Sequence, residues 1–137
     1  MKKLIIFAAV VVVLFIALIL LTDSQNDTTD DPLYDNEVSP NELETKLENE
    51  EGVTVYFYSP ECQYCLETTP RLVPLAEEMD IDLVLYNLLE HEQGWQDYGL
   101  ESTPTVVHYE NGEEVNRIVG AAPDEDFEAF FNHFVID

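Results

Sequence analysis

The sequence contains two cysteines, separated by two residues in the segment Cys62-Gln63-Tyr64-Cys65. Residues 53–58 before them have the composition of a β-strand and the residues after them have helical periodicity, so we expect Cys62 near a helix N-terminus. Backbone N–H groups and the positive end of the helix dipole stabilise a thiolate there, and the thiolate is the nucleophile of disulfide exchange. Cys65 lies one turn later and can attack a mixed disulfide formed at Cys62. The spacing therefore predicts a redox-active Cys62–Cys65 pair in which Cys62 attacks and Cys65 resolves, with no further cofactor.

Two other uses of a cysteine pair have weaker support. A structural disulfide across so short a loop restricts the unfolded chain little and would contribute modest stability. A zinc site would need two more ligands, whereas the three histidines, His91, His108 and His133, are spread singly over different predicted elements. We therefore predict no metal site.

The elements around the cysteines alternate between helix and strand. Ser39, Pro40 and Glu42 have the pattern of a helix N-terminus with a capping box, and Asn111-Gly112 is a strong signal for a hairpin turn. The predicted order is a helix from residue 39, a strand at 53–58, a helix after Cys62 with Leu72, Leu75, Ala76 and Met79 at helical spacing, a strand at 81–86, a short helix at 91–98, strands at 105–109 and 114–119, and a last helix with Phe127, Phe130, Phe131 and Phe134 on one face. This order predicts an α/β fold in which helices flank a mixed central sheet.

From about residue 38 to residue 137 the chain resembles the thioredoxin superfamily, and within it the membrane-anchored extracytoplasmic thioredoxin-like proteins of bacteria. Besides the cysteine motif, the matching features are Pro70 in the following helix, Ser102-Thr103-Pro104-Thr105 in place of the family's cis-proline loop, Asn111-Gly112-Glu113 at the hairpin, and Val119-Gly120-Ala121 after the last strand. The resemblance implies a thioredoxin-like fold and thiol-disulfide oxidoreductase activity. It also implies a cis peptide bond before Pro104, with Thr103 and Pro104 binding the substrate chain beside Cys62.

The motif departs from that of typical thioredoxins at positions that could modulate the cysteines. Glu61 replaces the Trp before the first cysteine, and Gln63-Tyr64 replaces Gly-Pro between the two. Tyr56 and, less directly, Leu85 stand where the family carries a buried Asp and a Lys that assist proton transfer. The usual internal base is therefore missing from these positions, and Glu61 or Glu67, acting through water, is the alternative that the sequence offers.

The N-terminus consists of Met1, Lys2 and Lys3 followed by 18 consecutive apolar residues, 4–21. This length approaches what a helix needs to cross a bilayer. A cleaved signal peptide would have a shorter apolar region and a small-residue cleavage site, which the following residues Thr22-Asp23-Ser24-Gln25 do not contain. We predict an uncleaved signal anchor at 1–21, with a cleaved signal peptide and a buried helix as alternatives. The two lysines place the N-terminus in the cytoplasm and the rest of the chain on the extracytoplasmic side of the cell membrane.

Charge is distributed unevenly along the chain. The sequence has 29 acidic and 5 basic residues and a formal net charge of −24, and only three of the basic residues follow residue 21, where the charge is −26. Such a surface excludes most electrostatic binding of nucleic acid and argues against anionic lipid surfaces, and it suits a saline or alkaline exterior. Residues 22–37, rich in Asp, Asn and Thr, predict a flexible acidic linker before a domain at 38–137.

We expect the protein to be a monomer that reduces disulfides in exported proteins, with electrons from a membrane thiol carrier. Glu61, Glu67 and the surrounding acids disfavour a thiolate at Cys62, and a less stabilised thiolate makes a less oxidising disulfide. A disulfide oxidase or isomerase is the alternative within the same class. A non-enzymatic thioredoxin-fold accessory protein, which binds a partner or passes on copper, is the alternative from another class.

Overall fold

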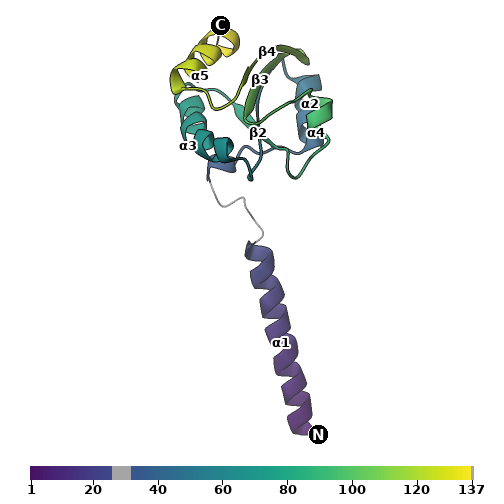
Figure 1. The fold of residues 1–137 in the computed structure, drawn as a ribbon. Coiled ribbons are helices and arrows are strands. Elements are labelled where there is room, and N and C mark those ends of the chain that lie inside the picture. The colour runs from purple at the N-terminus through teal and green to yellow at the C-terminus, as the bar shows by residue number, and fades with distance from the viewer. Residues whose placement is uncertain (26–31, 137) are drawn as a thin grey trace. The chain divides into compact units, whose positions relative to one another are not determined.

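The structure, a computed structural model, describes residues 1–25 and 32–136 (Figure 1). The chain divides into two units, Met1–Pro32 and Leu33–Asp137. The described part of the first unit is dominated by helix α1 (Lys2–Gln25). Among the described residues, α1 is the one helix long and apolar enough to cross a membrane, over Lys2–Leu21, a property that membrane anchors share with signal sequences.

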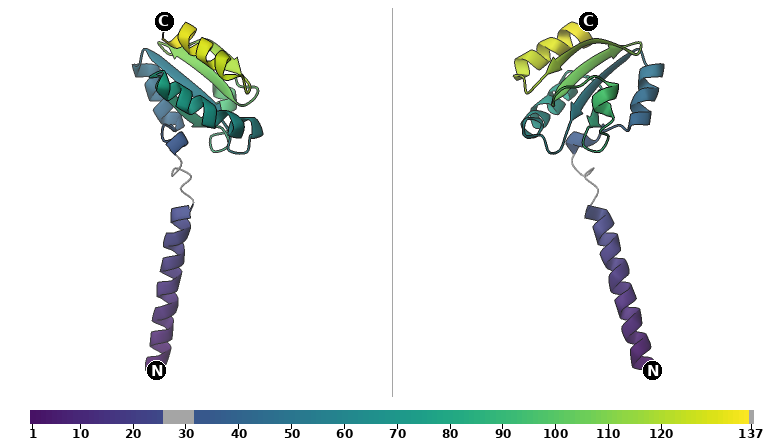
Figure 2. Two further views of the ribbon diagram at one scale, coloured as in Figure 1. Left: turned by 90° about the vertical axis from the view of Figure 1, so that its left-hand side faces the viewer. Right: turned by 45° about the vertical axis from the view of Figure 1, so that its right-hand side comes forward.

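The second unit is built on a four-stranded sheet in the order β2-β1-β3-β4. β1 pairs in parallel with β2 and antiparallel with β3, and β3 pairs antiparallel with β4. The elements are η2 (Pro32–Tyr34), α2 (Pro40–Asn49), β1 (Gly52–Tyr58), α3 (Gln63–Glu78), β2 (Leu83–Asn87), α4 (Gly94–Asp97), β3 (Thr105–Glu110), β4 (Glu113–Val119), α5 (Asp124–Phe130) and the π-helical turn η3 (Phe131–Val135). Figures 1 and 2 show α3 and α5 on one face of the sheet and α2 and α4 on the other. The predicted α/β fold with helices flanking a mixed sheet is thus confirmed.

β1 is an inner strand of the sheet, and all its residues from Val53 to Tyr58 are buried. Tyr56 and Tyr58 lie in the apolar core under α3 and α5, whereas Val55 and Phe57 lie in the core under α2. A strand covered on both faces requires such a run of β-branched and aromatic residues. Because β1 is held on both faces and along both edges, the position of the segment between Tyr58 and Cys62 is well defined.

The two strongest local signals in the sequence are present in the structure. In the capping box of α2, the Ser39 hydroxyl oxygen accepts the Glu42 N–H at 3.2 Å and the Glu42 carboxylate accepts the Ser39 N–H at 3.4 Å. Asn111 and Gly112, between β3 and β4, have φ of +54° and +81°. Positive φ at both central residues is what a two-residue hairpin turn of this kind requires.

Some elements differ from the sequence prediction at their ends. β2 begins two residues later than the predicted strand at 81–86, and α4 covers only four of the residues predicted as helical at 91–98. The predicted stripe of phenylalanines is divided between α5 and η3, and its last member, Phe134, is only partly buried.

The chain enters the second unit before residue 38. Leu33 and Tyr34 pack against the core under α3 and α5, Glu37 pairs in parallel with Leu85, and the Tyr58 O–H donates to the Glu37 carboxylate at 2.8 Å. The predicted linker at 22–37 therefore overlaps α1 at its start and the folded unit at its end, because burial of Leu33 and Tyr34 stabilises the packed arrangement. Residues 26–31 of that prediction lie outside the described residues.

We predict that Gly94→Ala destabilises the protein. An added Cβ at this buried glycine would lie 2.6 Å from Cε1 of Tyr86 and 2.9 Å from Cδ2 of Leu88, and the Tyr86 ring is itself buried. Overpacking of this kind costs about 1–3 kcal/mol, measurable as a lower urea midpoint of the full chain. Gly52→Ala is the matched control, since its Cβ would meet only His108 Cε1, at 3.6 Å. Equal midpoints for the two variants would contradict the prediction.

Candidate active site

The sulfur of Cys62 caps helix α3. Cys62 is the N-cap residue, with extended backbone angles, and α3 begins at Gln63. Its Sγ accepts the backbone N–H of Cys65 at 3.2 Å, and its own N–H donates to the carbonyl oxygen of Ser59 at 3.1 Å. Cys62 thus stands at the junction of β1 and α3, where the sequence analysis expected it.

The two cysteines differ in exposure. Both are free thiols, Cys62 is partly exposed, and Cys65 is 1% exposed in the core under α3 and α5. A disulfide approaching from solvent therefore meets Cys62 first. Cys65, whose N–H already contacts the Cys62 sulfur, lies behind it in the position of a resolving thiol.

The two thiols also differ in acidity. Burial raises the pKa of Cys62, but hydrogen bonds from the Cys65 thiol, Thr103 and the backbone N–H groups of Cys65 and Tyr64 outweigh it, so the pKa is lowered. Burial raises the pKa of Cys65 to about 12, and its thiol–thiol hydrogen bond with Cys62 acts in the same direction. Cys62 is therefore the more acidic of the two thiols.

The lowered pKa of Cys62 agrees with the predicted stabilisation of its thiolate by backbone N–H groups. Glu61 and Glu67 were predicted to oppose that stabilisation, but the largest contributions to the pKa come from burial and from hydrogen bonds. Glu61 and Glu67 are both exposed, so water screens their charges, whereas the N–H groups act at contact distance.

The loop before β3 completes the site. The Thr103–Pro104 peptide bond is cis, and the carbonyl oxygen of Thr103 lies 3.6 Å from Sγ of Cys62 and accepts its S–H. The carbonyl of Pro104 accepts the N–H of Gly120 at 2.8 Å, which ties the loop to the end of β4. The structure thus brings Cys62, Cys65, Thr103 and Pro104 together.

Arg117 of β4 supports this loop, and no pattern in the sequence predicts that role. Its guanidinium donates to the carbonyl oxygens of Tyr98 at 3.1 Å and Gly99 at 3.0 Å, just before the cis-proline loop, and forms an ion pair with Glu114. The Glu114–Arg117 spacing could suggest the ion pair. The two carbonyls are 18 and 19 residues away in the chain, so only the folded sheet shows that contact.

A family model described as a thioredoxin-like domain matches residues 39–134, which include all the residues of the site. The chain belongs to the thioredoxin-like family. Among curated relatives, thioredoxin of Porphyra purpurea is 30% identical over 91 residues, covering 65% of this chain and 85% of the relative. Chloroplastic thioredoxin M4 of Arabidopsis thaliana is 32% identical over 114 residues, covering 81% of this chain and 59% of the relative.

Solved thioredoxin structures have the same fold. The reduced thioredoxin of Schistosoma mansoni superposes with a TM-score of 0.65 at 27% identity, covering 72% of this chain and 96% of that one. A mutant thioredoxin of Halobacterium salinarum superposes with a TM-score of 0.61 at 23% identity, covering 73% of this chain and 92% of that one. With its two adjacent cysteines, this thioredoxin-like protein is a thiol-disulfide oxidoreductase.

The residues proposed as modulators fall into two groups. Glu61, Gln63 and Tyr64 are exposed around Cys62, and Tyr64 is 63% exposed. Tyr56 is fully buried in β1, opposite Leu85 of β2, and its hydroxyl lies 2.9 Å from Oγ1 of Thr69. The structure therefore places only Tyr56 beneath the dithiol.

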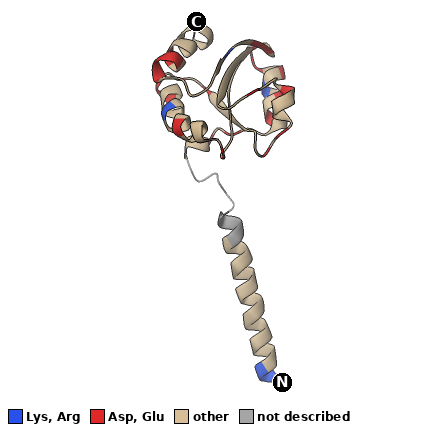
Figure 3. Cartoon of the chain, viewed as in Figure 1, with Lys and Arg blue, Asp and Glu red and all other residues tan. Residues whose placement is uncertain are grey.

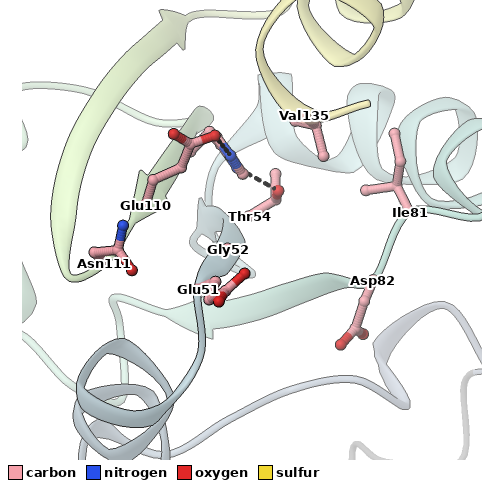
Figure 4. A pocket seen from close by; sticks show the side chains of 9 residues that line it. Glu51, Gly52, Thr54, Ile81, Asp82, Glu110, Asn111 and Val135 are labelled. Carbon is pink, nitrogen blue, oxygen red and sulfur yellow. Dashed lines mark hydrogen bonds and ion pairs between the residues drawn. The ribbon is translucent and has the colours of Figure 1, made fainter. Parts of the chain in front are cut away.

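His108 lies away from the cysteines in the fold. His108 is buried, with Nδ1 2.9 Å from Oγ1 of Thr54 and Nε2 3.4 Å from Oε1 of Glu110. All three residues line a cavity of about 420 Å³ at the start of β1, and Figure 4 shows Thr54 and Glu110 around it. Cys62 follows the other end of that strand. In the part of the chain that the structure describes, no three His, Cys, Asp or Glu side chains are grouped so that they could hold a metal ion.

We predict that iodoacetamide modifies the reduced protein at Cys62 alone near neutral pH. Below the pKa of Cys62 its thiolate is lost, so the rate should rise with pH and level off at a pH below that for a cysteine in an unstructured peptide, while Cys65 reacts only as pH approaches about 12. Mass spectrometry of peptides after timed quenching separates the two sites. Comparable rates at both cysteines at neutral pH would contradict the assignment.

Proposed function

We propose that the protein reduces disulfides in exported proteins on the extracytoplasmic side of a membrane to which α1 anchors it. The observation that carries the proposal is the contact of the partly exposed Cys62 sulfur with both the first turn of α3 and the carbonyl of Thr103. Cys62 can attack an incoming disulfide, while the backbone of the cis-proline loop can pair with the extended chain that carries it.

The reaction proceeds through two exchanges. The Cys62 thiolate attacks one sulfur of the substrate, forms a mixed disulfide and releases the other substrate sulfur, which takes up a proton. Cys65 then loses its proton and attacks Cys62, forming the Cys62–Cys65 disulfide and releasing the second substrate thiol. The substrate disulfide is thereby reduced and the protein dithiol oxidised, and a membrane thiol carrier is proposed to return two electrons to the pair.

Reduction, rather than oxidation, is supported by how the Cys62 thiolate is stabilised. Strong oxidants of this kind have a greatly stabilised thiolate. Here the stabilisation comes from hydrogen bonds, and the three basic residues of the second unit are engaged elsewhere, in ion pairs of Lys46 with Glu50, Arg71 with Asp124, and Arg117 with Glu114. A thiolate without a cationic partner favours a moderately reducing pair.

The acidic surface selects substrates by charge. Figure 3 shows acidic residues on helices and loops of the second unit and few basic ones. Because those basic residues are paired, little free positive charge is available to an acidic partner. We therefore propose that the preferred substrates carry basic residues near their disulfide.

Trapping tests the two-step mechanism. Cys65→Ser should leave mixed disulfides between Cys62 and its substrates unresolved, so that they can be isolated from the native host and identified, and Cys62→Ser should give none. The wild-type pair should equilibrate near the roughly −270 mV of thioredoxins. A potential near the −120 mV or so of strong oxidants, or trapped partners that are newly exported proteins still being oxidised, would establish the oxidase instead.

Paired peptides test the charge preference. Two peptides with the same disulfide, flanked by Lys in one and Glu in the other, should differ roughly tenfold or more in kcat/KM at low salt, with the Lys peptide faster. The difference should shrink at about 1 M NaCl because salt screens the attraction. Reduction of both peptides by uncharged dithiothreitol corrects for their own reactivity. Equal corrected rates at low salt would exclude the preference.

A further inference from the structure

A chain of hydrogen bonds runs from the sheet to the resolving cysteine. The hydroxyl of Tyr56, in β1, lies 2.9 Å from Oγ1 of Thr69, in α3. Oγ1 of Thr69 in turn lies 2.7 Å from the carbonyl oxygen of Cys65. All three residues are at most 1% exposed, so water does not compete for these bonds.

The direction of this chain follows from its atoms. A carbonyl oxygen can only accept, so the single hydroxyl hydrogen of Thr69 points to Cys65. Thr69 must then accept the hydroxyl hydrogen of Tyr56. Burial raises the pKa of Tyr56, which keeps its hydroxyl protonated, so the chain is neutral from end to end.

The first turn of α3 has particular need of such support. Pro70 lacks the N–H that the carbonyl of Leu66 would otherwise accept, so the backbone ladder is interrupted directly after Thr69. Thr68 and Thr69 donate side-chain bonds back to the carbonyls of Tyr64 and Cys65, both at 2.7 Å. Of these two, Thr69 also bonds to the sheet, through Tyr56.

The ring of Tyr56 is itself held in place. It stacks on the ring of Tyr58 with a centroid distance of 5.9 Å and an interplanar angle of 7°. A fixed ring keeps the Tyr56 hydroxyl at Thr69. The Cys65 carbonyl is therefore linked through two hydrogen bonds to β1, an inner strand that is buried on both faces.

We propose that Tyr56 is a positioning residue for the resolving step, holding Cys65 through Thr69 so that its sulfur is aimed at Cys62. The proposal rests on the proposed disulfide exchange at Cys62 and Cys65. In the step concerned, a bond forms between the two cysteine sulfurs and the bond from Cys62 to the substrate sulfur breaks. Cys65 gives up a proton and the leaving sulfur takes one up, while Tyr56 keeps its own.

The experiment separates the two exchange steps in Tyr56→Phe and Thr69→Val. Rapid acid quenching with a disulfide peptide gives the rate at which the mixed disulfide forms and the rate at which it resolves. We expect unchanged formation and resolution slower by roughly three- to tenfold, the effect of one buried hydrogen bond. The double variant should resolve no more slowly than the slower single one, because both residues act in one chain. Thr69→Ser should retain wild-type resolution.

Two neighbouring residues provide matched controls. Tyr58→Phe removes a neighbouring hydroxyl of the same strand that bonds to Glu37, and Thr68→Val removes an equivalent helix bond that ends at Tyr64. Both should resolve mixed disulfides at the wild-type rate. Equal slowing in the controls, or normal resolution in both Tyr56→Phe and Thr69→Val, would overturn the proposal. If wild-type protein forms no mixed disulfide at all, the proposed exchange itself is wrong. That result is distinct from one in which exchange occurs but the hydrogen bonds of Tyr56 and Thr69 do not affect resolution.

Discussion

A helix begins with backbone N–H groups that have no acceptor within the helix, and in α3 the sulfur of Cys62 accepts one of them. The same requirement is met in α2 by the hydroxyl of Ser39. A hydroxyl cap only satisfies the unpaired N–H group of the helix. A sulfur cap links helix formation to acidity, because the contact that satisfies the N–H also stabilises the thiolate. The nucleophile is thus a consequence of how the helix starts.

The remaining structure keeps this cap in place and makes the second thiol different from it. β1, buried on both faces, determines where the chain emerges at Ser59, whose carbonyl holds the N–H of Cys62. One turn further on, Cys65 turns into the core, where burial keeps it protonated. Two identical side chains three residues apart thereby acquire different properties: Cys62 is partly exposed with a lowered pKa, and Cys65 is buried with a raised pKa. The cis-proline loop, supported by Arg117, then faces the reactive sulfur.

Much of this arrangement can be predicted from the sequence, because it depends on local patterns. Runs of apolar residues locate β1 and β2, Ser39 and Glu42 locate the start of α2, and the cysteine spacing locates the site. What cannot be predicted depends on partners distant in the chain. The packing of Leu33 and Tyr34, the contacts of Arg117 with Tyr98 and Gly99, and the bond of Tyr56 to Thr69 all join residues whose proximity only the fold creates. The hydrogen bonds of Cys62 with the Cys65 thiol and Thr103 likewise appear only in the folded structure.

The pairing of every basic residue in the second unit has a consequence for the redox chemistry around the protein. Lys46, Arg71 and Arg117 each face a carboxylate, so little positive charge offsets the field of the acidic residues of this unit. Small thiols that carry net negative charge are repelled by such a field and approach Cys62 slowly. Thiol-disulfide exchange between the Cys62–Cys65 pair and an anionic thiol buffer is therefore slow, even where its equilibrium is favourable.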